Sequence, residues 1–156
     1  IIAIGEIGLE DLTDTEIDIF KRQLDIADET KSNVIIHTPR KNKKEVLKEI
    51  LKILPQHLDE KQAVIDHVNP NVVQDAIDTD CMLGLTVQPQ KMDKTEAISI
   101  LDEYGFDKFL LNSDISNKPS DPLSVPKTVR ELERLGYAKN DIEKVSHKNA
   151  EDFFKL

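Results

Sequence analysis

The sequence predicts an α/β protein built as a partial (β/α)8 TIM barrel, with about five βα units and parallel strands. Short apolar runs alternate with amphipathic segments along the whole chain, which is typical of parallel strands joined by helices. Five units in 156 residues give about 31 residues each, and eight such units would give roughly the 250 residues of a complete barrel. An open doubly wound sheet is the alternative, although no GxGxxG follows the first apolar run, which disfavours a dinucleotide-binding fold.

Five apolar runs are predicted to be the strands. They cover residues 1–4, 33–37, 62–67, 81–87 and 108–112. The first run opens the sequence without a methionine and leads into a loop around Gly8. Because a domain rarely begins on so apolar a run, we expect that residues precede it. We therefore expect residues 1–156 to form one domain that is the C-terminal part of a barrel.

Helical spacing of apolar residues predicts the segments between the strands. The predicted helices cover residues 13–31, 43–54, 70–77, 94–104, 122–135 and 140–156. Thr13 or Asp14 is expected to cap the first helix, and Pro55 and Gly105 are expected to end the second and fourth. A loop over residues 113–121 follows the last strand.

The composition is that of a globular protein with an aliphatic core. Charged residues make up 33% and hydrophobic residues 38% of the chain, while aromatic residues are only 4%. The single cysteine, Cys81, excludes an internal disulfide, fits a reducing cytoplasm and is expected to be a buried, inert thiol. No apolar stretch approaches the roughly 20 residues that span a bilayer, so we expect no membrane contact.

The net charge of −9 argues against a protein that binds nucleic acid through a broad basic surface. It does not exclude a nuclease, because bound divalent ions can neutralise a few phosphates locally. The run from Arg40 to Lys44 could contact phosphate, but a solvated helix start explains it better.

Residues that can bind metal follow four of the five predicted strands. They are Glu6, His37, His67 and Asp114. In a parallel α/β barrel the carboxyl ends of the strands converge on one rim, so residues thirty or more positions apart would meet there. Imidazole nitrogens and carboxylate oxygens suit Zn²⁺, Mn²⁺ and similar ions. Each residue alone could equally be a cap or a paired polar group, and their regular placement favours a shared metal site.

Other polar residues are assigned smaller roles. His57 is expected to be exposed in a loop, and His147 to be a capping or surface residue. Side chains expected to line the pocket or to orient the ligands are Thr86, Gln88, Glu10, Asn69, Asn112 and Ser113.

Several blocks of sequence, in this order and spacing, resemble the TatD-related metal-dependent hydrolases, and most closely their archaeal branch. They are GEIGLE (5–10), VIIHTPR (34–40), VIDHVN (64–69), TVQP (86–89), LLNSDIS (110–116) and SHKNAEDFF (146–154). The resemblance covers nearly the whole chain. It implies that Glu6 is a carboxylate ligand shared between two divalent ions (Zn, Mg or Mn) and that His37 and His67 hold the second ion. Asp114 would bind the first ion or deprotonate the attacking water.

The resemblance also implies hydrolysis, commonly of phosphodiester bonds in DNA. The family's N-terminal H-x-H pair has no counterpart in this sequence, so the first metal site would lack two ligands. An upstream segment or self-association is expected to complete the barrel. Two alternatives stay open: an amidohydrolase-like enzyme acting on a small molecule, and a truncated or degenerate domain that binds metal without catalysis.

Overall fold

A computed structural model describes residues 1–115 and 119–156 of the chain, and its centre is one sheet of five parallel strands. The strands are β1 (Ala3–Gly8), β2 (Asn33–His37), β3 (Ala63–Ile65), β4 (Met82–Thr86) and β5 (Phe109–Asn112). They lie side by side in the order of the sequence, and each pairs in parallel with the next. A doubly wound sheet reverses its strand order at a switch point, and this sheet does not, so the predicted barrel-like α/β fold is confirmed.

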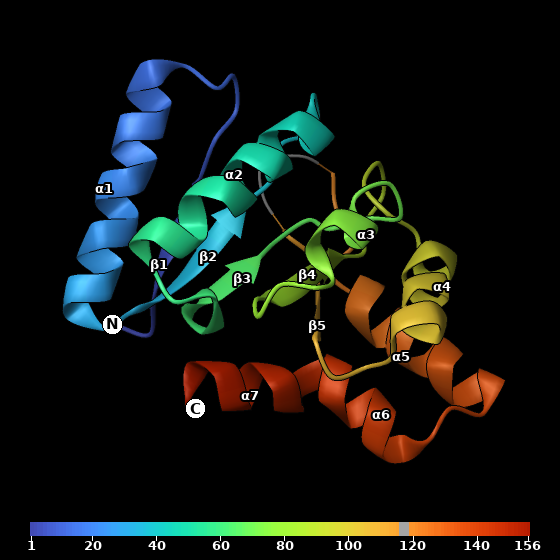
Figure 1. Cartoon of the computed structure of the whole chain (residues 1–156). Coiled ribbons are helices and arrows are strands. Elements are labelled where there is room, and N and C mark those ends of the chain that lie inside the picture. The colour runs from blue at the N-terminus through green and yellow to red at the C-terminus, as the bar shows by residue number, and fades with distance from the viewer. Residues whose placement is uncertain (116–118) are drawn as a thin grey trace.

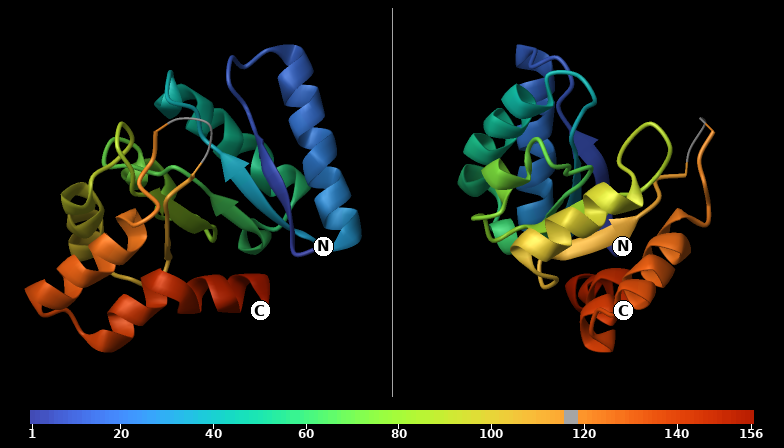
Figure 2. Two further views of the ribbon diagram at one scale, coloured as in Figure 1. Left: turned by 180° about the vertical axis from the view of Figure 1, so that it is seen from behind. Right: turned by 90° about the vertical axis from the view of Figure 1, so that its right-hand side faces the viewer.

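The helices between the strands cover one face of the sheet, and further helices follow β5, as Figure 1 and Figure 2 show. They are α1 (Asp14–Thr30), α2 (Lys43–His57), η1 (Glu60–Gln62), α3 (Val73–Ala76), α4 (Lys94–Tyr104), α5 (Ser124–Leu135), α6 (Lys139–Glu143), the π-helical η2 (Lys144–Lys148) and α7 (Asn149–Phe154). The residues of the predicted last loop that fall at 116–118 lie outside the described part of the chain.

The ends of α1 and α4 follow the local signals in the sequence. Thr13 caps α1 in a capping box, because its Oγ1 accepts from the Glu16 backbone N–H at 3.3 Å while the Glu16 carboxylate accepts from the Thr13 N–H at 3.0 Å. Gly105 ends α4 with φ 82°, a backbone region that favours glycine. Both predictions are confirmed.

Five predictions of local structure are wrong. Pro55 does not end α2, which continues to His57 and closes with Leu58 N–H donating to Leu54 C=O at 2.9 Å. Packing of the buried Leu54 and Leu58 outweighs the one helical hydrogen bond that proline removes. The helix predicted from residue 70 begins only at Val73, because residues 69–72 form a turn around Asn69.

The first strand and His57 complete these corrections. The strand runs over Ala3–Gly8, so Glu6 lies inside β1 rather than after it. His57 is the last residue of α2 rather than a loop residue, and its Nδ1 lies 2.7 Å from Asp25 Oδ1 on α1. His147 is exposed, as predicted, but it belongs to η2, which divides the predicted last helix.

The C-terminal helices are fixed to the start of β5, at the end of the sheet opposite the strand-end residues. The Asn149 side-chain amide donates to the carbonyls of Phe106 and Phe109, both at 2.8 Å. The SHKNAEDFF block of the sequence therefore has a structural role in this fold, since its Asn149 holds the last helices against the sheet.

The core is aliphatic, as the composition predicts, with Phe20 and Phe109 as its fully buried aromatic side chains. Cys81 lies within this core, and burial raises the pKa of its thiol to about 12. Within residues 1–115 and 119–156 there is no helix of the length and apolarity that crossing a membrane requires.

The buried thiol leads to a test of the core. Because the pKa of Cys81 is raised to about 12, roughly one thiol in ten thousand is ionised at about pH 8. We expect iodoacetamide to leave Cys81 unmodified in the folded protein and to alkylate it rapidly in guanidinium chloride, as measured by mass spectrometry. Rapid alkylation of the folded protein at pH 8 would contradict the burial.

Candidate metal centre

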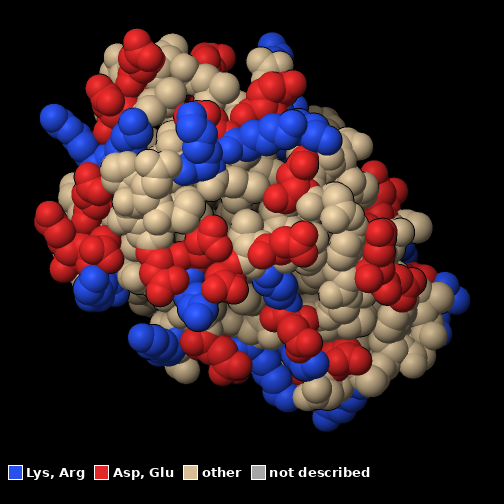
Figure 3. All heavy atoms as spheres, viewed as in Figure 1, with Lys and Arg blue, Asp and Glu red and all other residues tan. Residues whose placement is uncertain are grey.

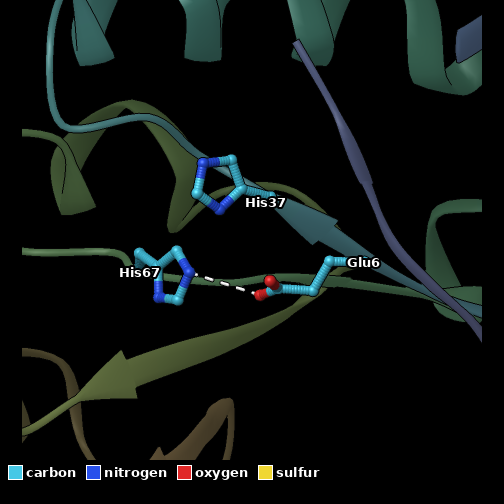
Figure 4. A group of neighbouring side chains, drawn as sticks. All are labelled: Glu6, His37 and His67. Carbon is cyan, nitrogen blue, oxygen red and sulfur yellow. Dashed lines mark ion pairs between the residues drawn. The ribbon is translucent and has the colours of Figure 1, made fainter. Parts of the chain in front are cut away.

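Three of the four predicted metal ligands meet at the carboxyl ends of the strands. Glu6 comes from β1, His37 is the last residue of β2, and His67 follows β3 by two residues (Figure 4). One potential ligand atom from each residue lies within 4.8 Å of the other two. Parallel strands in sequence order bring them together, because neighbouring strands end at the same edge.

The backbone of His67 is held in the left-handed region, with φ 62°, by contacts on both sides of the residue. Its N–H donates to Asp66 Oδ1 at 2.7 Å, and its carbonyl accepts from the Lys43 ammonium at 3.0 Å. Lys43 also donates to the Thr38 carbonyl and hydroxyl, at 3.0 and 2.7 Å. These bonds tie the turn after β3 to the end of β2.

The side chain of Thr86 at the end of β4 selects one tautomer of His67. The Thr86 hydroxyl donates to Asp66 Oδ1 at 3.4 Å, so it is an acceptor for His67 Nδ1–H, which lies 2.7 Å away. His67 Nε2 then faces Glu6 Oε1, at 3.2 Å. A proton between these two atoms makes the contact a hydrogen bond to the Glu6 carboxylate, and a cation in its place would be bound by both atoms.

The second histidine is oriented by a carboxylate. His37 Nε2 lies 2.9 Å from Glu10 Oε1. Because a carboxylate can only accept, Nε2–H is the donor, and His37 Nδ1 is left as an acceptor. The rings of His37 and His67 meet edge to face with centroids 5.0 Å apart. Metal-binding histidines usually donate their other N–H to an oxygen in this way.

The protonation states of the cluster suit a divalent cation. The hydrogen bond with His67 lowers the pKa of Glu6, and burial lowers the pKa of His37. At neutral pH this favours a carboxylate and a neutral imidazole, which are the forms that bind metal. The residues therefore fit the ion that their donor types suggest, with Glu6, His37 Nδ1 and His67 Nε2 facing one another.

The carboxylate of Asp66 holds the residues around His67 together through hydrogen bonds. Besides His67 N–H and Thr86, it accepts from the Asn112 side-chain amide of β5 at 2.8 Å. Asp66 lies directly against Gly84 of β4, where an added Cβ would be 2.1 Å from Asp66 Oδ1. Glycine at this position leaves the space that the carboxylate occupies.

The fourth predicted ligand, Asp114, lines the same pocket but has a different partner. Its Oδ2 pairs with the ammonium of Lys91, and Gln88 Nε2 contacts its carbonyl oxygen at 3.2 Å and its Oδ2 at 3.3 Å. Lys91 Nζ also lies 3.3 Å from both ring nitrogens of His67. The assignment of Asp114 to a metal stays a prediction, while its contact with Lys91 links it to the cluster.

The cluster opens into a pocket of about 460 Å³ that carries three cations. Arg40, Lys43 and Lys91 line it together with Asn69, which was expected near the ligands. Burial lowers the pKa of Lys43 to about 8. Lys43 is thus part of the pocket wall rather than of a solvated helix start, whereas Lys41 and Lys44 are exposed as expected.

The sequence pattern missed Asp66 and Lys91 and undervalued Lys43. Asp66 immediately precedes a candidate ligand and could have been found by that position. Lys91 carries no such signal, because it lies beyond the end of β4 and reaches Asp114 only through the folded loop. Ser113 is half-buried directly before Asp114.

A sheet of parallel strands in sequence order with a Glu-His-His cluster at their carboxyl ends is typical of α/β-barrel proteins with a metal site at the C-terminal face. The sequence model described as TatD related DNase matches residues 1–155. The chain belongs to this TatD-related family.

Relatives with this fold come from archaea and bacteria. An uncharacterised metal-dependent hydrolase of Methanocaldococcus jannaschii is 40% identical over 158 residues, which cover 100% of this chain and 62% of that protein. A TatD-like protein of Archaeoglobus fulgidus is 33% identical with a TM-score of 0.81, over 99% of this chain and 60% of that one. A phosphotriesterase homology protein of Escherichia coli has a TM-score of 0.82 at 17% identity, and the match covers 98% of this chain and 59% of that one. This likeness shows a shared fold. The chain spans about three-fifths of the length of these proteins.

The contact between Gly84 and Asp66 predicts the effect of adding one methyl group. In Gly84→Ala the carboxylate must move, which disrupts its bonds to His67, Thr86 and Asn112. We expect a loss of about 2–3 kcal/mol in the free energy of unfolding, together with weaker Zn²⁺ binding. Denaturant titration and a competitive chelator assay measure the two. Gly105→Ala, in open space at the end of α4, is the control, and should change stability without changing Zn²⁺ affinity.

Loss of the Thr86 hydroxyl tests the tautomer of His67. Thr86→Val removes the acceptor for Nδ1–H, and we expect Zn²⁺ affinity to fall about 10- to 100-fold, measured by competition with a chromogenic chelator. Thr128→Val replaces another buried threonine whose hydroxyl bonds within α5, and should leave Zn²⁺ affinity unchanged. Equal affinities for the wild type and Thr86→Val would show that Thr86 does not orient the ring.

Proposed function

We propose that the protein is a TatD-type metal-dependent hydrolase that cleaves phosphodiester bonds. The observation that carries this proposal is the cluster of Glu6, His37 and His67, whose ligand atoms lie within 4.8 Å of one another. Two imidazoles and a carboxylate are ligands for Zn²⁺ or Mn²⁺, and the carboxylate also accommodates Mg²⁺.

The residues of the pocket have complementary roles in this proposal. Glu6, His37 Nδ1 and His67 Nε2 would hold the ion, which when bound lowers the pKa of water and neutralises charge on phosphoryl oxygens. Asp114, which lines the same pocket, accepts the proton of the attacking water. Lys91 orients Asp114 through their ion pair.

Local cations support an anionic substrate despite the net charge of −9. Figure 3 shows acidic and basic side chains interspersed over the visible face rather than gathered in one basic surface. Within the pocket, Arg40 and Lys91 are positioned to contact non-bridging phosphoryl oxygens. The family description as a DNase and the phosphate bound in the active site of the Escherichia coli protein support the same substrate class.

A second candidate is hydrolysis of a small amide. The same ligand set can polarise an amide carbonyl, and the acidic protein surface disfavours a long polyanion. The two candidates differ in whether phosphodiesters or amides are cleaved, so one substrate panel separates them.

We also propose that the protein acts in the cytoplasm. Cys81 is a free, buried thiol, and the sequence contains no second cysteine with which it could form a disulfide. Such cysteine usage is typical of reducing compartments.

The proposed activity is tested with bis(p-nitrophenyl) phosphate and a single-stranded DNA oligonucleotide, beside a panel of p-nitroanilide amides. We expect release of p-nitrophenol and cleavage of DNA with Mn²⁺, Zn²⁺ or Mg²⁺ and neither with EDTA. Because His67→Ala removes a ligand, it should reduce the metal-dependent rate by roughly a hundredfold or more.

The matched control is His147→Ala, which removes an exposed histidine of η2 and should keep the full rate. Cleavage of amides alone would favour the second candidate. Metal binding that depends on His67 without hydrolysis of any substrate would instead indicate a non-catalytic metal-binding domain.

A further inference from the structure

A second cavity of about 420 Å³ lies beside the metal pocket. Its walls are the segment that follows β4 and the beginning of α5. Gln90, Lys91 and Met92 line both cavities, so the two are neighbours separated by this short segment. A molecule bound at the metal centre can therefore extend into the second cavity past Lys91.

The wall of this cavity is largely apolar and its charges are already paired. Val87, Pro89 and Met92 form the apolar part. Among the charged groups, Lys94 Nζ lies 2.9 Å from Glu131 Oε2, and Lys127 Nζ lies 2.6 Å from Asp121 Oδ2. Two more carboxylates line the cavity, and both already accept hydrogen bonds. Asp93 caps the beginning of α4, and Glu96 completes that capping box. The cavity thus favours an uncharged group.

Ser124, at the start of α5, supplies a hydrogen-bonding group without a partner. The residue is 6% exposed, and in the described part of the chain its buried Oγ has no hydrogen-bond partner. A buried hydroxyl without a partner costs free energy, and such groups are rare in folded proteins. Ser124 lines the cavity, and rotation about its Cα–Cβ bond would turn Oγ toward a bound group that donates to it or accepts from it.

An anion is a poor candidate for this position. Asp121 already occupies the beginning of α5, where its Oδ1 accepts from the Leu123 N–H at 3.0 Å while Oδ2 binds Lys127. A phosphate or carboxylate placed there would face this carboxylate. The cations of the neighbouring metal pocket are the better place for a phosphoryl group.

We propose that this cavity is a subsite for an uncharged, largely apolar ring, such as a nucleobase, with a polar edge that hydrogen-bonds to Ser124. An apolar cavity of roughly 150 Å³ holds benzene, so a cavity of about 420 Å³ has room for a substituted ring. The ring's role as the group next to the scissile bond rests on the proposed hydrolase function. Binding of the ring itself does not, and is measured separately.

The test uses thymidine as the uncharged probe and the full chain kept in EDTA, so that no hydrolysis is needed. We expect thymidine to shift the amide NMR signals of Val87, Gln88, residues 90–92 and Ser124, and 2-deoxyribose, which lacks the nucleobase, to leave them unchanged. Ser124→Ala should weaken thymidine binding about 3- to 10-fold, the value of one hydrogen bond. It should not lower the thermal unfolding midpoint, because the hydroxyl has no partner among the described residues.

Ser146→Ala, far along the chain in η2, is the matched control and should bind thymidine as the wild type does. Ser124→Val, which adds bulk to the cavity wall, should weaken binding further than Ser124→Ala. The proposal is overturned if thymidine shifts none of these signals at millimolar concentration, or if Ser124→Ala and Ser124→Val bind as tightly as the wild type. Binding without any hydrolysis in the metal-loaded protein would contradict the proposed activity and leave the subsite intact.

Discussion

The carboxylate of Asp66 accepts hydrogen bonds from the His67 backbone, the Thr86 hydroxyl and the Asn112 amide, and these bonds determine the geometry of the metal centre. They join the ends of β3, β4 and β5. Gly84 leaves the space that this requires. Through Thr86 the same carboxylate determines which nitrogen of His67 faces Glu6. A hydrogen-bond network behind His67 thus sets the position and the orientation of this ring, as is common at metal sites.

The two ends of the sheet have different functions. At the carboxyl ends, Glu6 and the two histidines meet beside three cations, in a protein whose net charge is −9. At the other end of β5, Asn149 holds the C-terminal helices to two backbone carbonyls. Sequence blocks of equal prominence therefore form the candidate metal centre in one case and fix the C-terminal helices in the other. This division follows the general rule that the activity of parallel α/β barrels lies at their C-terminal face.

The neighbouring cavities differ in their electrostatics. In the metal pocket, Arg40, Lys43 and Lys91 add positive charge next to the ligands, whereas the charged groups around the cavity at Ser124 are paired with one another. Lys91 belongs to both, because its ammonium lies between Asp114 and His67 while its segment forms the common wall. A substrate with an anionic reacting group and an uncharged ring would match this pair of cavities.

The sequence by itself determined the succession of strands and helices and the cluster of Glu6, His37 and His67, because periodicity and position at strand ends are local properties. It could not determine that Pro55 is tolerated inside α2, since that depends on packing of Leu54 and Leu58. Only the tertiary structure paired Asp114 with Lys91 and brought Ser124 to the wall of a second cavity. These contacts join residues of different loops, and their distances depend on how the loops close over the ends of the sheet, which no local pattern encodes.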